Sequence, residues 1–428
     1  MHEITYPPFN EKMYQEQLDN GLTVFLLPKP GFQQTFSVFT TRFGSIDQTF
    51  EMNDGKDLLT VPDGIAHFLE HKMFESQEID VFQEFARHGA SANAFTTFDQ
   101  TSYLFTSTQD ILENTTILLD YVQDPYFTEE NVEKEKGIIG QEIRMYEDNP
   151  DWQSFFGLLK AMYKTHPVHL DIAGTVESIA GITKDLLYDC YRTFYHPANM
   201  VYVAVGGFDP EQMMNHIRSN QAAKNFPKAP PFTRVPVDEQ KEVATPQVTA
   251  ELSVSQPRCI IGWKDADVGL TGESLLKQEL LTGVILDTLF GRGSDAYHEF
   301  IDEELIDQQF SWEYECTESY GYSLVGGNTS NPDLLLRRIN ETLDRARYSG
   351  LSQDEFERNR KKAMGRFAMA MDSPTAIARN FTSYHLKGVD WFSSIQILEN
   401  LTLEQANERL NSHFVSSQQA ASIVTPKE

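Results

Sequence analysis

Two histidines four residues apart constrain this chain more than any other feature. Residues 64–76 read Gly-Ile-Ala-His-Phe-Leu-Glu-His-Lys-Met-Phe-Glu-Ser, so His67, Glu70 and His71 form a His-x-x-Glu-His pattern. On a helix, side chains at positions i and i+4 point the same way, so the two imidazoles can bind one metal ion. Glu70 lies beside them, where a carboxylate can take a proton from water. The pattern therefore predicts a metal-binding helical turn.

The alternative is an ordinary amphipathic helix with three solvated polar positions. The neighbouring residues favour the metal site, because most of them are apolar and predict that the three polar side chains lie against protein: Ile65, Ala66, Phe68, Leu69 and Met73.

A catalytic zinc ion needs a third protein ligand and leaves its fourth position for water. Residues 129–147 are expected to form a helix with Glu142 on an inward apolar stripe, shared with Ile138, Ile139, Ile143 and Tyr146, and with Glu135 two turns earlier. A buried carboxylate is costly without a partner, and a dication supplies one. We expect Glu142 to be the third ligand and Glu135 to be a catalytic-site carboxylate that orients a ligand. Two alternatives stay open: Glu135 on a solvent-facing ridge, and Glu147 in place of Glu142.

These residues resemble the pitrilysin and insulinase family of zinc peptidases, which includes the mitochondrial processing peptidases. Other segments also resemble motifs of this family and occur in the family's order: Gly-Ala-Ser-Ala-Asn-Ala-Phe-Thr at 89–96, Thr101-Ser102-Tyr103, His166-Pro167, Gly174-Thr175, and Tyr195-His196-Pro197-Ala198-Asn199-Met200. The resemblance implies an endopeptidase with one Zn²⁺ per chain, bound by His67, His71 and Glu142, and with Glu70 as general base. It also implies that Asn93 and Ala94 bind the peptide, on a strand whose edge accepts an extended chain. A strand covered by its own neighbours is the alternative.

The resemblance further implies an α+β fold of the clamshell type, built from two similar α/β-sandwich halves, each a mostly antiparallel sheet covered by helices. Residues 1–224 would be the zinc-binding half and residues 248–428 the zinc-free half, joined by a proline-rich linker at 225–247. Strands are expected at 22–27, 35–42, 102–107 and 200–205. Residues 280–306 are expected to form a long helix that occupies the place of the zinc helix without its histidines.

The second half departs from the family. Active members use an Arg and a Tyr from a zinc-free half to hold the peptide, but residues 294–336 contain no Arg, and Tyr314, Tyr320 and Tyr322 fit ordinary strand positions. We therefore expect a dimer in which a zinc-free paralogue supplies Arg and Tyr, with a homodimer as the alternative.

Composition limits the remaining possibilities. The net charge of −28 argues against nucleic acid as a partner. It fits either a chamber that prefers basic peptides or an evenly solvated acidic surface. Three widely spaced cysteines indicate no disulfide framework, and the absence of a signal peptide or a long apolar run predicts a cytoplasmic protein that does not enter membranes. Two function classes remain: a zinc endopeptidase, and a non-catalytic assembly or scaffold subunit of a peptidase complex.

Overall fold

The computed structural model describes residues 1–52, 55, 57–76 and 80–427 of the chain. It divides into two compact units whose segments alternate along the sequence. Unit 1 comprises residues 1–143, 171–236 and 370–386, and unit 2 comprises residues 144–170, 237–369 and 387–428. All residues of the predicted metal site lie in unit 1.

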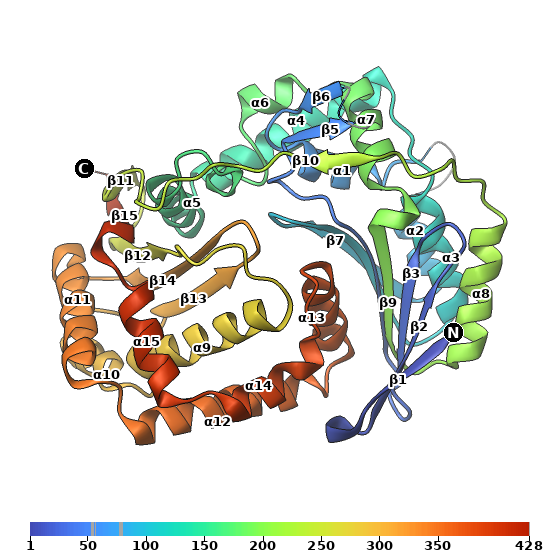
Figure 1. Cartoon of the computed structure of the whole chain (residues 1–428). Coiled ribbons are helices and arrows are strands. Elements are labelled where there is room, and N and C mark those ends of the chain that lie inside the picture. The colour runs from blue at the N-terminus through green and yellow to red at the C-terminus, as the bar shows by residue number, and fades with distance from the viewer. Residues whose placement is uncertain (53–54, 56, 77–79, 428) are drawn as a thin grey trace. The chain divides into compact units, whose positions relative to one another are not determined.

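Unit 1 is built around a mixed, mostly antiparallel sheet (Figure 1). In spatial order its described strands are β1 (His2–Tyr6), β2 (Glu11–Gln17), β3 (Thr23–Pro28), β9 (Met200–Gly206), β4 (Thr35–Thr41), β8 (Thr101–Ser107) and β7 (Ala90–Thr96). Only the β3–β9 pair is parallel among these. The four predicted strands are confirmed, with ends that differ by no more than one residue.

Helices cover both faces of this sheet. Figure 1 shows α3 (Ile111–Val122) and α8 (Pro210–Ala222) on one side and α13 (Pro374–Leu386) on the other. Every residue of the central strands β4 and β9 is buried as a result. Strand β7, at the edge, instead alternates between exposed and half-buried positions along most of its length. Because β7 pairs with β8 alone among the described strands, its outer edge carries unpaired backbone groups.

The rest of unit 1 positions the predicted site. A small sheet has the order β10 (Phe232–Arg234), β5 (Thr49–Met52) and β6 (Asp57–Thr60). The remaining α-helices of its described part are α1 (Ile65–Lys72), α2 (Val81–Arg87), α4 (Glu129–Glu147), α6 (Val176–Ala180) and α7 (Lys184–Phe194), and the end of α4 beyond Ile143 belongs to unit 2. Helix α1 packs on β7, β8 and α7, which places it next to the edge strand.

Unit 2 contains a second sheet, in the order β11 (Gln247–Leu252), β15 (Gln419–Pro426), β12 (Arg258–Lys264), β14 (Gly321–Asn328) and β13 (Ser311–Cys316). Its described helices are α5 (Pro150–Met162), α9 (Gly272–Phe290), α10 (Asp295–Asp302), α11 (Pro332–Ser349), α12 (Gln353–Ala370), α14 (Ser394–Asn400) and α15 (Leu403–His413).

The two sheets share one topology. In each sheet, five strands have the same arrangement: the first of the five in sequence runs parallel to the last, and the last, second, fourth and third then follow in antiparallel pairs. Here β3, β4, β7, β8 and β9 of unit 1 correspond to β11, β12, β13, β14 and β15 of unit 2. The expectation of an α+β fold with two similar halves is thereby confirmed, and α9 occupies the place that α1 has in unit 1.

One expectation about a helix is wrong. The helix predicted at 280–306 is two helices, α9 and α10, because α9 ends at Phe290 and residues 291–294 do not continue it. Two helices pack in the unit opposite to their sequence half. Helix α5, from the first half of the sequence, packs on β11, β12 and β15 of unit 2, and α13, from the second half, packs on β4 and β9 of unit 1. The compact units are therefore not contiguous stretches, and the division at residues 225–247 remains a prediction about the sequence halves. That segment is mostly irregular and contains the short strand β10.

No helix in the described part of the chain is long and apolar enough to cross a bilayer. Cys190, Cys259 and Cys316 are buried free thiols.

Candidate metal centre

The metal-binding turn predicted from the sequence is helix α1. Gly64 precedes it at a φ of +87°, and a Cβ there would lie 2.4 Å from the carbonyl oxygen of Ala173. Glycine is therefore required for the chain to enter the helix so close to its neighbour. Phe68 and Leu69 are fully buried and fix the orientation of α1. The imidazoles of His67 and His71 consequently project together, with ring centroids 4.6 Å apart.

Glu142 of helix α4 completes a group of three donors. One atom each of His67, His71 and Glu142 can be chosen so that all lie within 4.8 Å of one another. His67 Nε2 is 3.7 Å from Glu142 Oε1, and His71 Nε2 is 3.5 Å from Glu142 Oε2. These separations exceed a hydrogen bond. Two atoms that each bind one tetrahedral zinc ion at its usual bond length would be about 3.4 Å apart, so the donor set and its spacing fit zinc.

Glu135 lies on α4 nearer the core than Glu142. Its side chain is 7% exposed, against 22% for Glu142. This burial excludes the solvent-facing ridge for Glu135. The stripe on α4 differs from the expected one, because Ile138 is 47% exposed. Glu147, the alternative ligand, is exposed at the end of the helix.

Glu135 contacts the nitrogen of His71 that faces away from Glu142. Its Oε1 lies 3.1 Å from His71 Nδ1, which fixes the ring with Nε2 toward Glu142. Such carboxylate support of a histidine is usual in metal sites. Within the described residues, the buried Nδ1 of His67 has no hydrogen-bond partner. The two histidines are therefore held differently, because only His71 has a carboxylate on its Nδ1.

Glu70 lies on the same turn and has a hydrogen bond that sequence reasoning missed. Thr96 Oγ1, at the end of β7, donates to Glu70 Oε2 at 2.6 Å. Glu70 is 8% exposed, and its carboxylate is thus fixed by the strand that borders the site. The sequence signal was weak, since Thr96 is one of several hydroxyl residues near residue 100.

Burial sets most of the electrostatics. Burial and the adjacent His71 lower the pKa of His67 to about 4, which leaves this imidazole neutral, the form that binds a metal ion. Burial raises the pKa of Glu70, and the Thr96 hydrogen bond opposes part of this rise. Burial also lowers the pKa of His71, but the hydrogen bond to Glu135 and three nearby carboxylates outweigh it, so the net change is upward. Burial raises the pKa of Glu135, but its contacts with His71 and the charges of Lys72 and Lys134 outweigh this, so the net change is downward.

The residues predicted to bind peptide lie on the open edge strand. Asn93 and Ala94 are on β7, and Ala94 N–H donates to Asn93 Oδ1 at 2.8 Å. This N–H is satisfied by a local side chain, so we infer that it faces the outer edge of the sheet. Tyr314, Tyr320 and Tyr322 are buried in unit 2.

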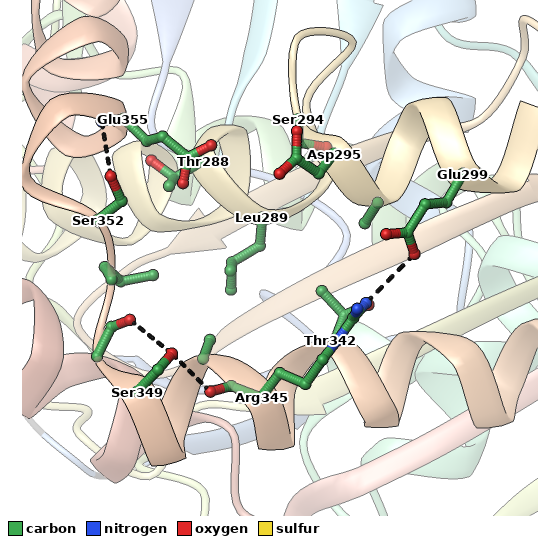
Figure 2. A pocket seen from close by; sticks show the side chains of 14 residues that line it. Thr288, Leu289, Ser294, Asp295, Glu299, Thr342, Arg345, Ser349, Ser352 and Glu355 are labelled. Atoms are coloured by element: carbon green, nitrogen blue, oxygen red, sulfur yellow. Dashed lines mark hydrogen bonds and ion pairs between the residues drawn. The ribbon is translucent and has the colours of Figure 1, made fainter.

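A separate cavity lies in unit 2 and contains none of these residues. It measures about 270 Å³ and lies between α9, α10, α11 and the start of α12 (Figure 2). Its charged lining residues include Arg345, whose guanidinium contacts Glu299 at 3.4 Å and Thr342 Oγ1 at 3.3 Å. The residues that line this cavity therefore differ from the predicted metal ligands His67, His71 and Glu142.

Comparisons with known proteins identify the family of the chain. A family model described as "Insulinase (Peptidase family M16)" matches residues 60–176, which contain His67, Glu70, His71, Glu135 and Glu142. A second, described as "Peptidase M16 inactive domain", matches residues 181–363. The chain is 45% identical over 424 residues to YmfH of Bacillus subtilis (strain 168), named an uncharacterized zinc protease, with 99% of each chain covered.

Solved structures show the same fold. A crystal structure of an M16-like peptidase from Alicyclobacillus acidocaldarius has a TM-score of 0.95 and 44% identity, covering 99% of this chain and 100% of that one. Pitrilysin, at 14% identity and a TM-score of 0.75, is matched over 100% of this chain but only 46% of its own length, and this likeness concerns the fold alone. The predicted family is confirmed: the chain belongs to the insulinase family of peptidases, family M16.

Proposed function

We propose that this chain is a zinc-dependent endopeptidase that hydrolyses peptides or short unfolded polypeptides. The observation that carries the proposal is the convergence of two histidines and Glu142 within 4.8 Å, with the buried carboxylate of Glu70 on the same helical turn. The zinc-protease names of its relatives support the choice of metal and reaction.

His67, His71 and Glu142 would hold one zinc ion per chain, and Glu135 would keep His71 oriented toward it. When bound, zinc supplies Lewis-acid activation of water and of the scissile carbonyl. Glu70 accepts the proton of the attacking water and delivers it to the leaving amine. Because its pKa is raised by burial, Glu70 is a better proton acceptor than an exposed glutamate. Thr96 keeps the Glu70 carboxylate in one orientation.

The peptide would bind along the outer edge of β7. An extended chain can add to an unpaired edge through backbone hydrogen bonds, which tolerate many side-chain sequences. Ala94 N–H would then donate to the peptide in place of Asn93 Oδ1, and the released Asn93 amide could also contact the peptide. Thr96, two residues along the same strand, links this edge directly to Glu70.

The proposal includes a second chain. The Arg that family resemblance requires has no counterpart in residues 294–336, and Tyr314, Tyr320 and Tyr322 in this stretch are buried. A paralogue without the zinc ligands would supply the Arg and the Tyr in a dimer, and a homodimer is the alternative. We therefore expect weak peptidase activity from the purified chain alone and a large increase on adding the paralogue.

The test combines metal analysis with peptide cleavage. In the presence of the partner, the wild type should contain zinc and cleave a quenched peptide in a chelator-sensitive manner. Glu70→Gln should retain zinc but lose turnover, whereas Glu142→Gln should lose zinc. Glu147→Gln, an exposed change on the same helix, is the matched control and should behave as the wild type. Normal cleavage by Glu70→Gln would refute the mechanism.

A scaffold role is the other candidate function, supported by the missing Arg in residues 294–336. A wild-type chain that binds its partner and zinc but cleaves no peptide under any condition would favour that role.

A further inference from the structure

Lys72 is a lysine that is buried completely beside the predicted ligands. It follows His71 as the last residue of α1, and its side chain has 0% exposure. Lysine is almost never fully buried unless its ammonium group is paired. Three groups meet Nζ here: Glu75 Oε2 at 2.5 Å, the carbonyl oxygen of Asn131 at 3.2 Å, and Glu135 Oε2 at 3.8 Å.

Two of these three groups belong to helix α4. Asn131 and Glu135 are four residues apart on α4, so they occupy successive turns of one face. Lys72 therefore joins α1, which carries both histidines, to α4, which carries Glu142. Glu75, in contrast, lies just after α1 and is 31% exposed.

The contacts of Glu135 show what Lys72 could do for the metal centre. One carboxylate oxygen of Glu135 faces Lys72, and the other lies 3.1 Å from His71 Nδ1. The opposite ring nitrogen, His71 Nε2, lies 3.5 Å from Glu142. Lys72, Glu135 and His71 thus form a continuous line that ends at the predicted ligand group. Glu135 therefore has a hydrogen-bond partner on one side and the Lys72 ammonium group, within ion-pair range, on the other, and both restrict its rotation and that of its histidine partner.

We propose that Lys72 is a positioning residue of the metal centre, which fixes Glu135 and, through it, the orientation of His71. The inference rests on the zinc-binding part of the proposed function and does not require peptidase activity. A purely structural link between α1 and α4 is the competing explanation. The two differ in their effect on zinc, because a structural link changes the stability of the zinc-free protein without changing its affinity for the metal.

The experiment measures zinc affinity of the full chain by competition with a chromophoric chelator at constant neutral pH. Thermal unfolding of the zinc-free protein is measured in parallel. Lys72→Met, which keeps the length of the side chain and removes its charge, should weaken zinc binding about 10- to 100-fold, the range found for residues that support metal ligands. Lys72→Arg should restore most of the affinity. Lys134→Met, an exposed lysine next to Glu135 on α4, is the matched control and should bind zinc as the wild type does.

A double-mutant cycle tests the path through Glu135. If Lys72 acts on the metal by holding Glu135, the combined Lys72→Met and Glu135→Gln protein should bind zinc no more weakly than Glu135→Gln alone. Multiplied losses would show that Lys72 acts by another route and would overturn the inference. So would unchanged zinc affinity in Lys72→Met together with a lower melting temperature of the zinc-free protein. If Lys72→Met is recovered unfolded, Lys72→Gln is measured in its place against the same criteria.

The outcome is separable from that of the proposed function. A wild-type chain that binds zinc but cleaves no peptide would contradict the peptidase proposal, and the affinity measurements would still test Lys72. A wild-type chain that binds no zinc would overturn both.

Discussion

Replacing Thr96 by valine removes one hydrogen bond from the proposed general base and almost nothing else. Valine has the shape of threonine, so the packing at the end of β7 is retained. Thr96 Oγ1 donates to Glu70 Oε2 at 2.6 Å and otherwise lies 3.4 Å from Thr101 Oγ1. Without the Thr96 hydroxyl, Glu70, which is only 8% exposed, loses a hydrogen-bond donor to its carboxylate.

The size of the effect follows from the charge on the acceptor. A hydrogen bond to an ionised group contributes about 1.5–3 kcal/mol. If this energy holds Glu70 in its productive orientation, losing it should lower kcat about 10- to 150-fold. Zinc content should not change, because Thr96 lies against Glu70 and not against a predicted ligand. Thr96→Ser keeps the hydroxyl and should retain most of the activity.

The assay is steady-state cleavage of a quenched peptide by the zinc-loaded protein with its partner, alongside zinc analysis. Thr106→Val is the matched control, since Thr106 lies on the neighbouring strand opposite Ser91, at the far end of the β7–β8 pair. A kcat for Thr96→Val within about twofold of the wild type, at full zinc content, would refute a role for Thr96 in positioning Glu70.

Two further changes test the framework of the fold. Gly64→Ala should destabilise the protein by about 2 kcal/mol and reduce its zinc content, because Gly64 has a φ of +87° and a Cβ would lie 2.4 Å from Ala173 O. Equilibrium urea unfolding measures the stability, and metal analysis measures the zinc content. An unfolding midpoint equal to that of the wild type would contradict the steric argument. Glu239 has its pKa lowered to about 2, because hydrogen bonds from Lys264 and from the backbone of residues 164–166 outweigh burial. A carboxylate whose pKa is lowered in the folded state stabilises the protein at pH values above its unfolded pKa of 4.5. This stabilisation is lost as the pH falls toward 2. The unfolding free energy of the wild type should therefore exceed that of Glu239→Gln by roughly 1–2 kcal/mol near neutral pH, and the two values should converge in acid. The difference is smaller than the full pKa shift implies because Glu239 is partly exposed to solvent. A constant difference across this pH range would contradict the assignment.

The sequence by itself determined the local features. The i, i+4 spacing of His67 and His71 places both imidazoles on one side of any helix that contains them, whatever that helix packs against. The apolar neighbours gave the buried face of α1. Runs of β-branched and aromatic residues gave strands β3, β4, β8 and β9 to within one residue, and the family resemblance gave the α+β fold of two similar halves.

Only the tertiary structure decided how distant residues meet. Glu135 and Glu142 share one helix, and their spacing could not tell which lies deeper; the packing of α4 against α1 decided it. Thr96 is 26 residues from Glu70, and Asn131 is 59 residues from Lys72, so no periodic pattern could pair them. The exchange of α5 and α13 between the units escaped sequence reasoning for the same reason. Helical and strand periods report which face of a segment is apolar, but the identity of the surface that covers this face is set by long-range packing.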